Sequence, residues 1–75
     1  MILPTKHTAA NEALIGAGAL ILQQTSNPIL LSNLWEAVKA NSAVQTYERF
    51  ILTLDMLHII GVINIDNNMI VRVEG

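Results

Sequence analysis

The side chains that most often bind metals are few in this sequence and widely separated. There are two histidines, His7 near the start and His58 towards the end, and no cysteine. A zinc site needs three or four ligands, and no zinc-binding motif surrounds either histidine. We therefore predict no metal site and no cofactor. His58 is expected to pack on the inner face of a helix.

Nucleophilic and phosphate-binding chemistry is equally hard to place. Several serines and threonines are present, but none lies in a nucleophile-elbow sequence. Gly16 and Gly18 fall inside an apolar segment and lack the lysine that follows a phosphate-binding loop. Glu48 and Asp55 lie on one predicted helix face, as a solvated acidic edge would. We predict a protein that is not an enzyme and has no catalytic residues.

The pattern of breaks and apolar positions predicts a small α+β domain. Pro4 favours an extended arm over residues 1–8, followed by a single domain over 9–75. Before the last segment we expect a helix over 9–24, a short strand over 29–31, and helices over 33–40 and 44–60. Ser32 would cap the second helix, and Gly61 would end the third in the left-handed conformation.

The last segment is predicted to be a β-hairpin with strands over 62–65 and 69–73. A three-residue loop would place the following residues on one apolar face: Ile63, Ile65, Met69, Val71 and Val73. A two-residue Asn-Asn loop would distribute them over both faces, so the longer loop is preferred. Helix, short strand, helix, helix and hairpin is the order of a winged helix-turn-helix domain, which is the predicted fold.

The third predicted helix carries two apolar stripes. The first, expected to face the core, consists of Tyr47, Phe50, Ile51, Leu54, Leu57 and His58. The second consists of Leu52, Met56 and Ile59, nearly opposite on a helix that turns about 100° per residue. In a helix-turn-helix protein this outer face reads DNA, so apolar residues there favour a protein partner. In the alternative, the first helix or the hairpin covers the second stripe.

Composition and charge argue against independent DNA binding. The 75 residues are 52% hydrophobic and 13% charged, with a net charge of −2. The basic residues, Lys6, Lys39, Arg49 and Arg72, are scattered, whereas a duplex-binding domain needs several phosphate contacts. The longest uncharged apolar run, 13–22, is too short to span a bilayer, which excludes a membrane protein. The absence of cysteine fits a cytoplasmic protein.

Five segments together carry a family resemblance that covers nearly the whole chain. They are Met1–His7, Leu14–Ala19, Ser32–Glu36, Phe50–Leu57 and Ile60–Ile63. These segments resemble the small middle component of bacterial three-component ABC systems, and the opening heptapeptide is the most specific of them. The resemblance implies two partners, a coiled-coil SMC/Rad50-like ATPase and an effector that is often a nuclease. It also implies a role in defence against phages and plasmids, as in Lamassu-type systems, and it transfers no catalytic residue.

Two functions are expected from these observations. The first is a non-catalytic winged-helix adaptor between the ATPase and the effector, which meets DNA only through the complex. Its candidate contact residues are Leu52, Met56 and Ile59 on the third helix, Leu3, Lys6 and His7 on the arm, and Trp35. Trp35 is expected to be mostly buried. The second function is a small DNA-binding regulator that forms a homodimer through the second stripe and contacts phosphates with Lys39, Arg49 and Arg72.

Overall fold

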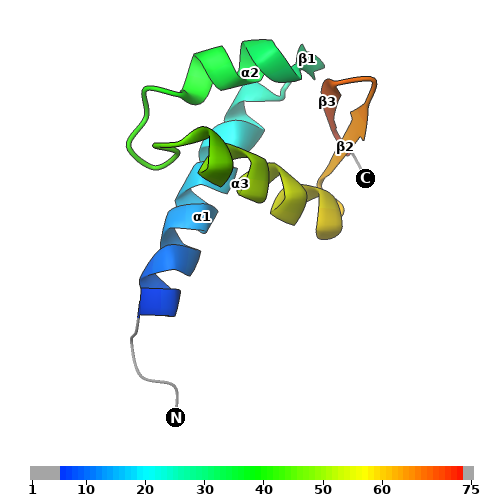
Figure 1. Cartoon of the computed structure of the whole chain (residues 1–75). Helices are drawn as coiled ribbons and strands as arrows, with labels where there is room; N and C mark the ends of the chain where they lie inside the picture. Colours follow the sequence, from blue (N-terminus) through cyan, green and yellow to red (C-terminus); the bar gives the residue numbers. More distant parts are fainter. Residues whose placement is uncertain (1–5, 74–75) are drawn as a thin grey trace.

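The computed structural model describes residues 6–73, and over residues 6–12 it describes the backbone alone. In chain order the elements are α1 (Lys6–Gln24), β1 (Ile29–Leu30), α2 (Leu31–Val38), α3 (Tyr47–Ile59), β2 (Ile63–Asp66) and β3 (Met69–Arg72). The predicted α+β class and element order are confirmed. Helix α3 crosses α1, and the hairpin lies beyond the C-terminal end of α3 (Figure 1). The three strands form one antiparallel sheet in the order β1-β3-β2.

Helix α1 begins earlier than predicted. The sequence favoured an extended arm over residues 1–8, whereas the helix begins at Lys6. Proline disfavours helix at the residue before it and not at those after it, so Pro4 is compatible with this start. Leu3 and the other residues of the segment 1–5 lie outside the described part of the chain.

Gly18 allows α1 to approach α3 closely. A methyl group at Gly18 would lie 3.3 Å from Cε of Met56 and 3.4 Å from Cδ2 of Leu57. At Gly16 the same group would meet only Cβ of Ala43, at 3.9 Å. Helix α1 therefore packs tightly against α3 at Gly18.

Helix α2 begins at Leu31, directly after β1, and Ser32 is not its cap. The cap position is Leu30, which is extended and makes no side-chain capping bond. The Leu31 amide donates instead to the carbonyl of Asn68 in the hairpin, at 2.7 Å. This bond satisfies a first-turn amide that has no partner within the helix, so the hairpin replaces a capping side chain.

Helix α3 begins at Tyr47, later than the predicted Val44. Val44 is buried in the connection before it, and Gln45 is left-handed with φ of 64°. Thr46 is the cap that the sequence analysis missed, and its hydroxyl accepts a hydrogen bond from the Arg49 amide at 3.1 Å. The apolar periodicity continued through Val44 and concealed this boundary.

The end of α3 is as predicted. Gly61 is left-handed, with φ of 84°. Its amide donates to the His58 carbonyl, and the Val62 amide donates to the Leu57 carbonyl, both at 3.0 Å. This pair of bonds is the Schellman motif, which satisfies carbonyls of the last turn and redirects the chain into β2.

The core draws on all three helices and on the hairpin. Its members are Ala17, Ile21, Leu34, Val38, Val44, Phe50, Leu54, Leu57, Ile63 and Ile70. The buried face of α3 consists of Phe50, Thr53, Leu54 and Leu57. The predicted inner stripe was wrong at Tyr47 and His58, which are both exposed. Thr53 is buried in their place because its hydroxyl donates to the Arg49 carbonyl at 2.7 Å.

The hairpin has a two-residue loop, so the predicted three-residue loop was wrong. Asn67 and Asn68 both have positive φ, 50° and 64°, as a type I′ turn requires. Asp66 therefore pairs with Met69, and Ile65 pairs with Ile70. Paired residues share a face, which puts the apolar residues on both faces of the sheet. Ile63 and Ile70 are buried, while Ile65 and Val73 are exposed.

Candidate protein-binding face

The outward side of α3 carries four exposed residues in a row. They are Glu48, Leu52, Asp55 and Ile59, called here the outward stripe. At about 100° per residue they lie opposite the buried face of the helix. Leu52 is 53% exposed and Ile59 is 83% exposed. Large apolar side chains on a stripe that none of the described elements covers are typical of a protein-binding surface.

The second apolar stripe that the sequence predicted is divided by the fold. Met56 is half-buried against the core, and its methyl group lies over Gly18 of α1. Leu52 and Ile59 remain on the surface. Helix α1 therefore covers one of the three predicted residues, because the close approach at Gly18 brings it over Met56.

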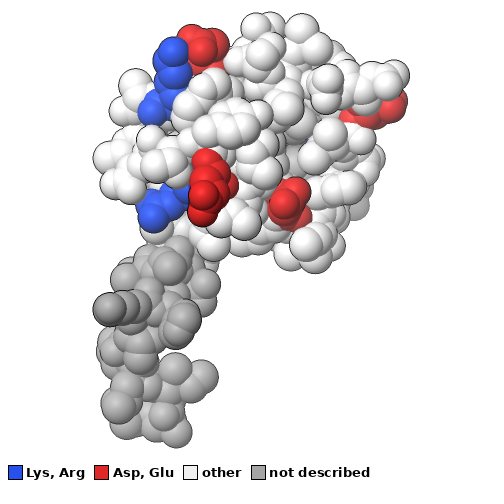
Figure 2. Space-filling model, in the orientation of Figure 1, with Lys and Arg blue, Asp and Glu red and all other residues white. Residues whose placement is uncertain are grey.

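The charges on the outward stripe are acidic. Glu48 and Asp55 lie beside Leu52 and Ile59, and none of the described basic residues lies within the stripe. Arg49 is half-buried on the flank, and Lys39, the C-cap residue of α2, pairs with Glu36 at 2.8 Å. Figure 2 shows the charged side chains of one face as separate small patches on a surface that is otherwise uncharged.

Three aromatic rings lie together where α2 meets the beginning of α3. The ring centroid of Trp35 is 5.1 Å from that of Tyr47 and 5.2 Å from that of Phe50. Phe50 is buried, Trp35 is half-buried and Tyr47 is half exposed. Trp35 thus packs against the core, with less burial than predicted, and Tyr47 adds apolar surface that the sequence analysis had assigned to the core.

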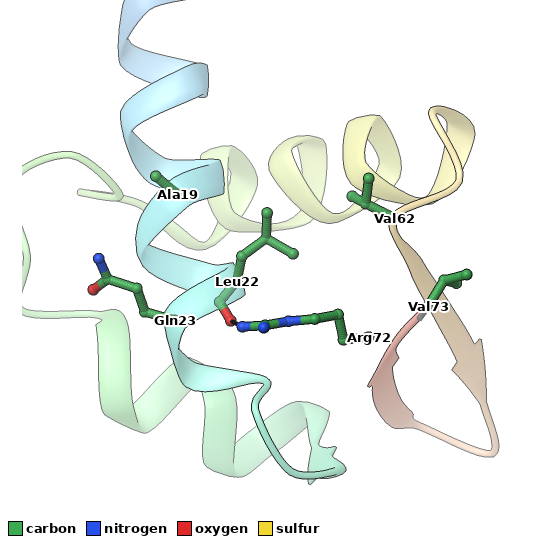
Figure 3. Close-up of a pocket in the computed structure, with 6 residues that line it drawn as sticks. All are labelled: Ala19, Leu22, Gln23, Val62, Arg72 and Val73. Carbon is green, nitrogen blue, oxygen red and sulfur yellow. Dashed lines mark hydrogen bonds between the residues drawn. The ribbon is translucent and has the colours of Figure 1, made fainter. Parts of the chain in front are cut away.

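A groove between α1 and the hairpin was not predicted. Its volume is about 440 Å³, and its lining residues are Ala19, Leu22, Gln23, Val62, Arg72 and Val73 (Figure 3). The Arg72 guanidinium reaches across and donates a hydrogen bond to the Leu22 carbonyl (Figure 3). A cation at the last turn of a helix is favourable because the carbonyl end of the helix is partly negative. Arg72 thereby ties β3 to the end of α1.

The other predicted contact residues are spread along the chain, and only some of their side chains are described. Lys6 and His7 belong to the first turn of α1, where the structure describes the backbone alone. Lys39 is the C-cap residue directly after α2, Arg49 lies on α3 and Arg72 lies on β3. Two of these three cations are already engaged, Lys39 by Glu36 and Arg72 by the Leu22 carbonyl.

Neither a metal-binding cluster nor a membrane-spanning helix is present among the described residues. Within them, no group of three or more His, Cys, Asp or Glu side chains could hold a metal ion. None of the helices described here has the length and apolar character needed to cross a membrane.

Comparison with known protein families gives a match over nearly the whole chain. The family model described as ABC-three component (ABC-3C) system Middle Component 6 matches residues 3–74. Neither a curated protein nor a solved structure matches the chain.

Proposed function

The chain belongs to the Middle Component 6 family of ABC-three component systems, and from this premise we propose that it is a non-catalytic adaptor. It links a coiled-coil SMC-like ATPase to an effector such as a nuclease, in defence against phages and plasmids. The observation that carries the proposal is the exposure of Leu52 and Ile59 on the outward side of α3. A subunit that works by contact needs such a surface. Among the described residues, no group of three or more His, Cys, Asp or Glu side chains could hold a metal ion.

The adaptor is a winged helix in this proposal. The order of helices and strands supports it, since a hairpin follows the third helix and a short strand precedes the second. The sheet order β1-β3-β2 supports it as well, because the hairpin is joined to the helical part through β1. In this fold α3 occupies the position of a recognition helix. Its outward stripe would then bind protein instead of DNA.

The proposed mechanism is coupling between two partners. The adaptor holds the effector restrained until the ATPase changes state on DNA, and it meets DNA only through the complex. Two surfaces are needed for this. The outward stripe of α3 is one, and the N-terminal segment that carries Leu3, Lys6 and His7 is proposed as the other.

The alternative function, a DNA-binding regulator, has less support. Glu48 and Asp55 would repel phosphates at the position of a recognition helix. Lys39 and Arg72 already have partners within the chain, the Glu36 carboxylate and the Leu22 carbonyl. A wing that carries a single engaged arginine provides few of the phosphate contacts on which duplex affinity depends.

The adaptor proposal is tested by co-purification with the other two components. The double variant Leu52→Asp and Ile59→Asp should retain at most about a tenth of at least one partner, because charge on a desolvated apolar contact is costly. Met56 is unsuitable for this test, since it packs against the core. The control is Ile15→Asp, the same change at an isoleucine of α1 that is 65% exposed. Normal assembly of a folded double variant, checked by circular dichroism, would refute this surface.

A further inference from the structure

We propose that the outward stripe of α3 binds a basic amphipathic helix of a partner subunit. The partner helix would place apolar side chains on Leu52 and Ile59 and would bring Lys or Arg side chains to Glu48 and Asp55. This inference rests on the proposed adaptor function and adds to it the chemistry of the partner.

The spacing of the stripe points to a helical partner. Residues 48, 52, 55 and 59 are separated by four, three and four positions. This alternation keeps the four residues on one face of α3, so that along a seam with a second helix Leu52 and Ile59 would occupy one set of positions and Glu48 and Asp55 the other. Helix α3 has 13 residues, so at 1.5 Å per residue it offers a seam about 20 Å long.

Distances along the helix favour a helix over an extended segment. Leu52 and Ile59 are about 10 Å apart along the axis of α3, as are Glu48 and Asp55, at 1.5 Å per residue. Two residues of a partner helix separated by seven positions match this distance and lie on one face. In an extended strand the same distance corresponds to about three residues, and side chains three positions apart point to opposite faces.

The negative charge of the stripe indicates that the partner helix is positively charged. The only charged members of the stripe are Glu48 and Asp55, and both are exposed. Arg49, the nearest described cation on α3, is half-buried on the flank, and Lys39 is already paired with Glu36. Neither carboxylate forms an ion pair with a described basic residue, so both are positioned to bind an incoming cation. Charges within a contact surface select partners by sign and accelerate association.

Because the stripe is small, its ion pairs should have a measurable effect on binding affinity. A seam of about 20 Å on one helix is shorter than the contacts of most stable complexes, so two ion pairs are a substantial part of its affinity. Exposed ion pairs are also weakened by salt. Binding of the isolated partner should therefore fall as the salt concentration rises.

The test measures binding of this chain to its ATPase and effector components, each purified separately, at about 50 mM and about 500 mM salt. The charge reversal Glu48→Lys with Asp55→Lys should weaken binding to one component about tenfold at low salt. The matched neutral pair Glu48→Gln with Asp55→Asn should weaken it less, and its salt dependence should be smaller. Thermal unfolding of each variant confirms that these exposed substitutions preserve the fold.

The two proposals can fail separately in this experiment. If charge reversal leaves binding unchanged while Leu52→Asp with Ile59→Asp abolishes it, the adaptor face stands and the basic partner helix is refuted. If neither pair of substitutions changes binding, both proposals fail. A photo-crosslinking residue at position 59 identifies what occupies the stripe. Crosslinks to a Lys- or Arg-rich helix support the inference, whereas crosslinks to an extended segment or to a second copy of this chain overturn it.

Discussion

At the scale of single residues, the α1–α3 contact depends on a missing side chain. Gly18 costs the helix about 1 kcal/mol relative to alanine, because glycine has greater freedom in the unfolded chain. In return, the Met56 and Leu57 side chains reach the surface of α1 at this position. This contact keeps Met56 out of the outward stripe and leaves Leu52 and Ile59 as its apolar members.

Substitutions at Gly18 should therefore depend strongly on size. Gly18→Ala should change the free energy of unfolding by less than about 1 kcal/mol, because improved helix propensity offsets the displacement of the flexible Met56 methyl group. Gly18→Leu should lower it by about 2 kcal/mol or more through overpacking. Gly16→Ala and Gly16→Leu are the controls, since that position is exposed. Urea denaturation measures all four variants, and equal stability of the two leucine variants would contradict the close contact.

At the scale of elements, the local signals were predictable and the long-range ones were not. The break before Ile29 and the stop at Gly61 are properties of neighbouring residues, so the element order followed from the sequence. The start of α2 depends on a hydrogen bond from Leu31 to Asn68, and the position of Arg72 depends on the Leu22 carbonyl. Partners this distant in sequence leave no local pattern.

The candidate site was predictable to the same extent. Periodicity identified Leu52 and Ile59 as outward residues, but it could not distinguish them from Met56, because only the path of α1 decides which is covered. It also placed Tyr47 and His58 inside. The buried face of α3 includes the polar residue Thr53 and therefore lies to one side of Tyr47 and His58. Thr53 can be buried because its hydroxyl donates to the backbone carbonyl of Arg49, one turn earlier.

The hairpin loop supplies a prediction at the element scale. Glycine adopts positive φ without the penalty that asparagine still carries, and Asn-Gly is the preferred type I′ pair. Asn68→Gly should therefore raise the free energy of unfolding by about 0.5 kcal/mol. Asn67→Ala should lower it by about 1 kcal/mol, because Asn67 is also left-handed.

The Asn67→Ala variant also distinguishes the two loop lengths. In a three-residue loop built on a type I turn, only the last residue is left-handed, and alanine would be tolerated at position 67. Chemical denaturation of both variants and of the unmodified chain measures these differences in the free energy of unfolding. An Asn67→Ala variant of undiminished stability would argue for the longer loop.

At the scale of the whole molecule, the distribution of charge favours the proposed adaptor over the DNA-binding regulator. The chain has a net charge of −2 and four basic residues. Of the three basic residues whose side chains are described, Arg72 bonds to a backbone carbonyl and Lys39 to a carboxylate. A surface of this kind releases few counterions from duplex DNA, and counterion release provides most of the non-specific affinity.

The isolated protein should accordingly fail to bind duplex DNA even at low salt. Fluorescence anisotropy of a labelled duplex, titrated at about 50 mM salt, should show no saturable increase at micromolar protein, whereas the assembled complex should bind through its ATPase. The variant Glu48→Lys with Asp55→Lys is an informative comparison, since it places two cations on the outward side of α3. Weak, salt-sensitive binding by this variant alone would show that the acidic stripe is what keeps DNA from the outward side of α3. Salt-dependent binding by the unmodified chain would instead favour the regulator, because only direct phosphate contacts produce that dependence.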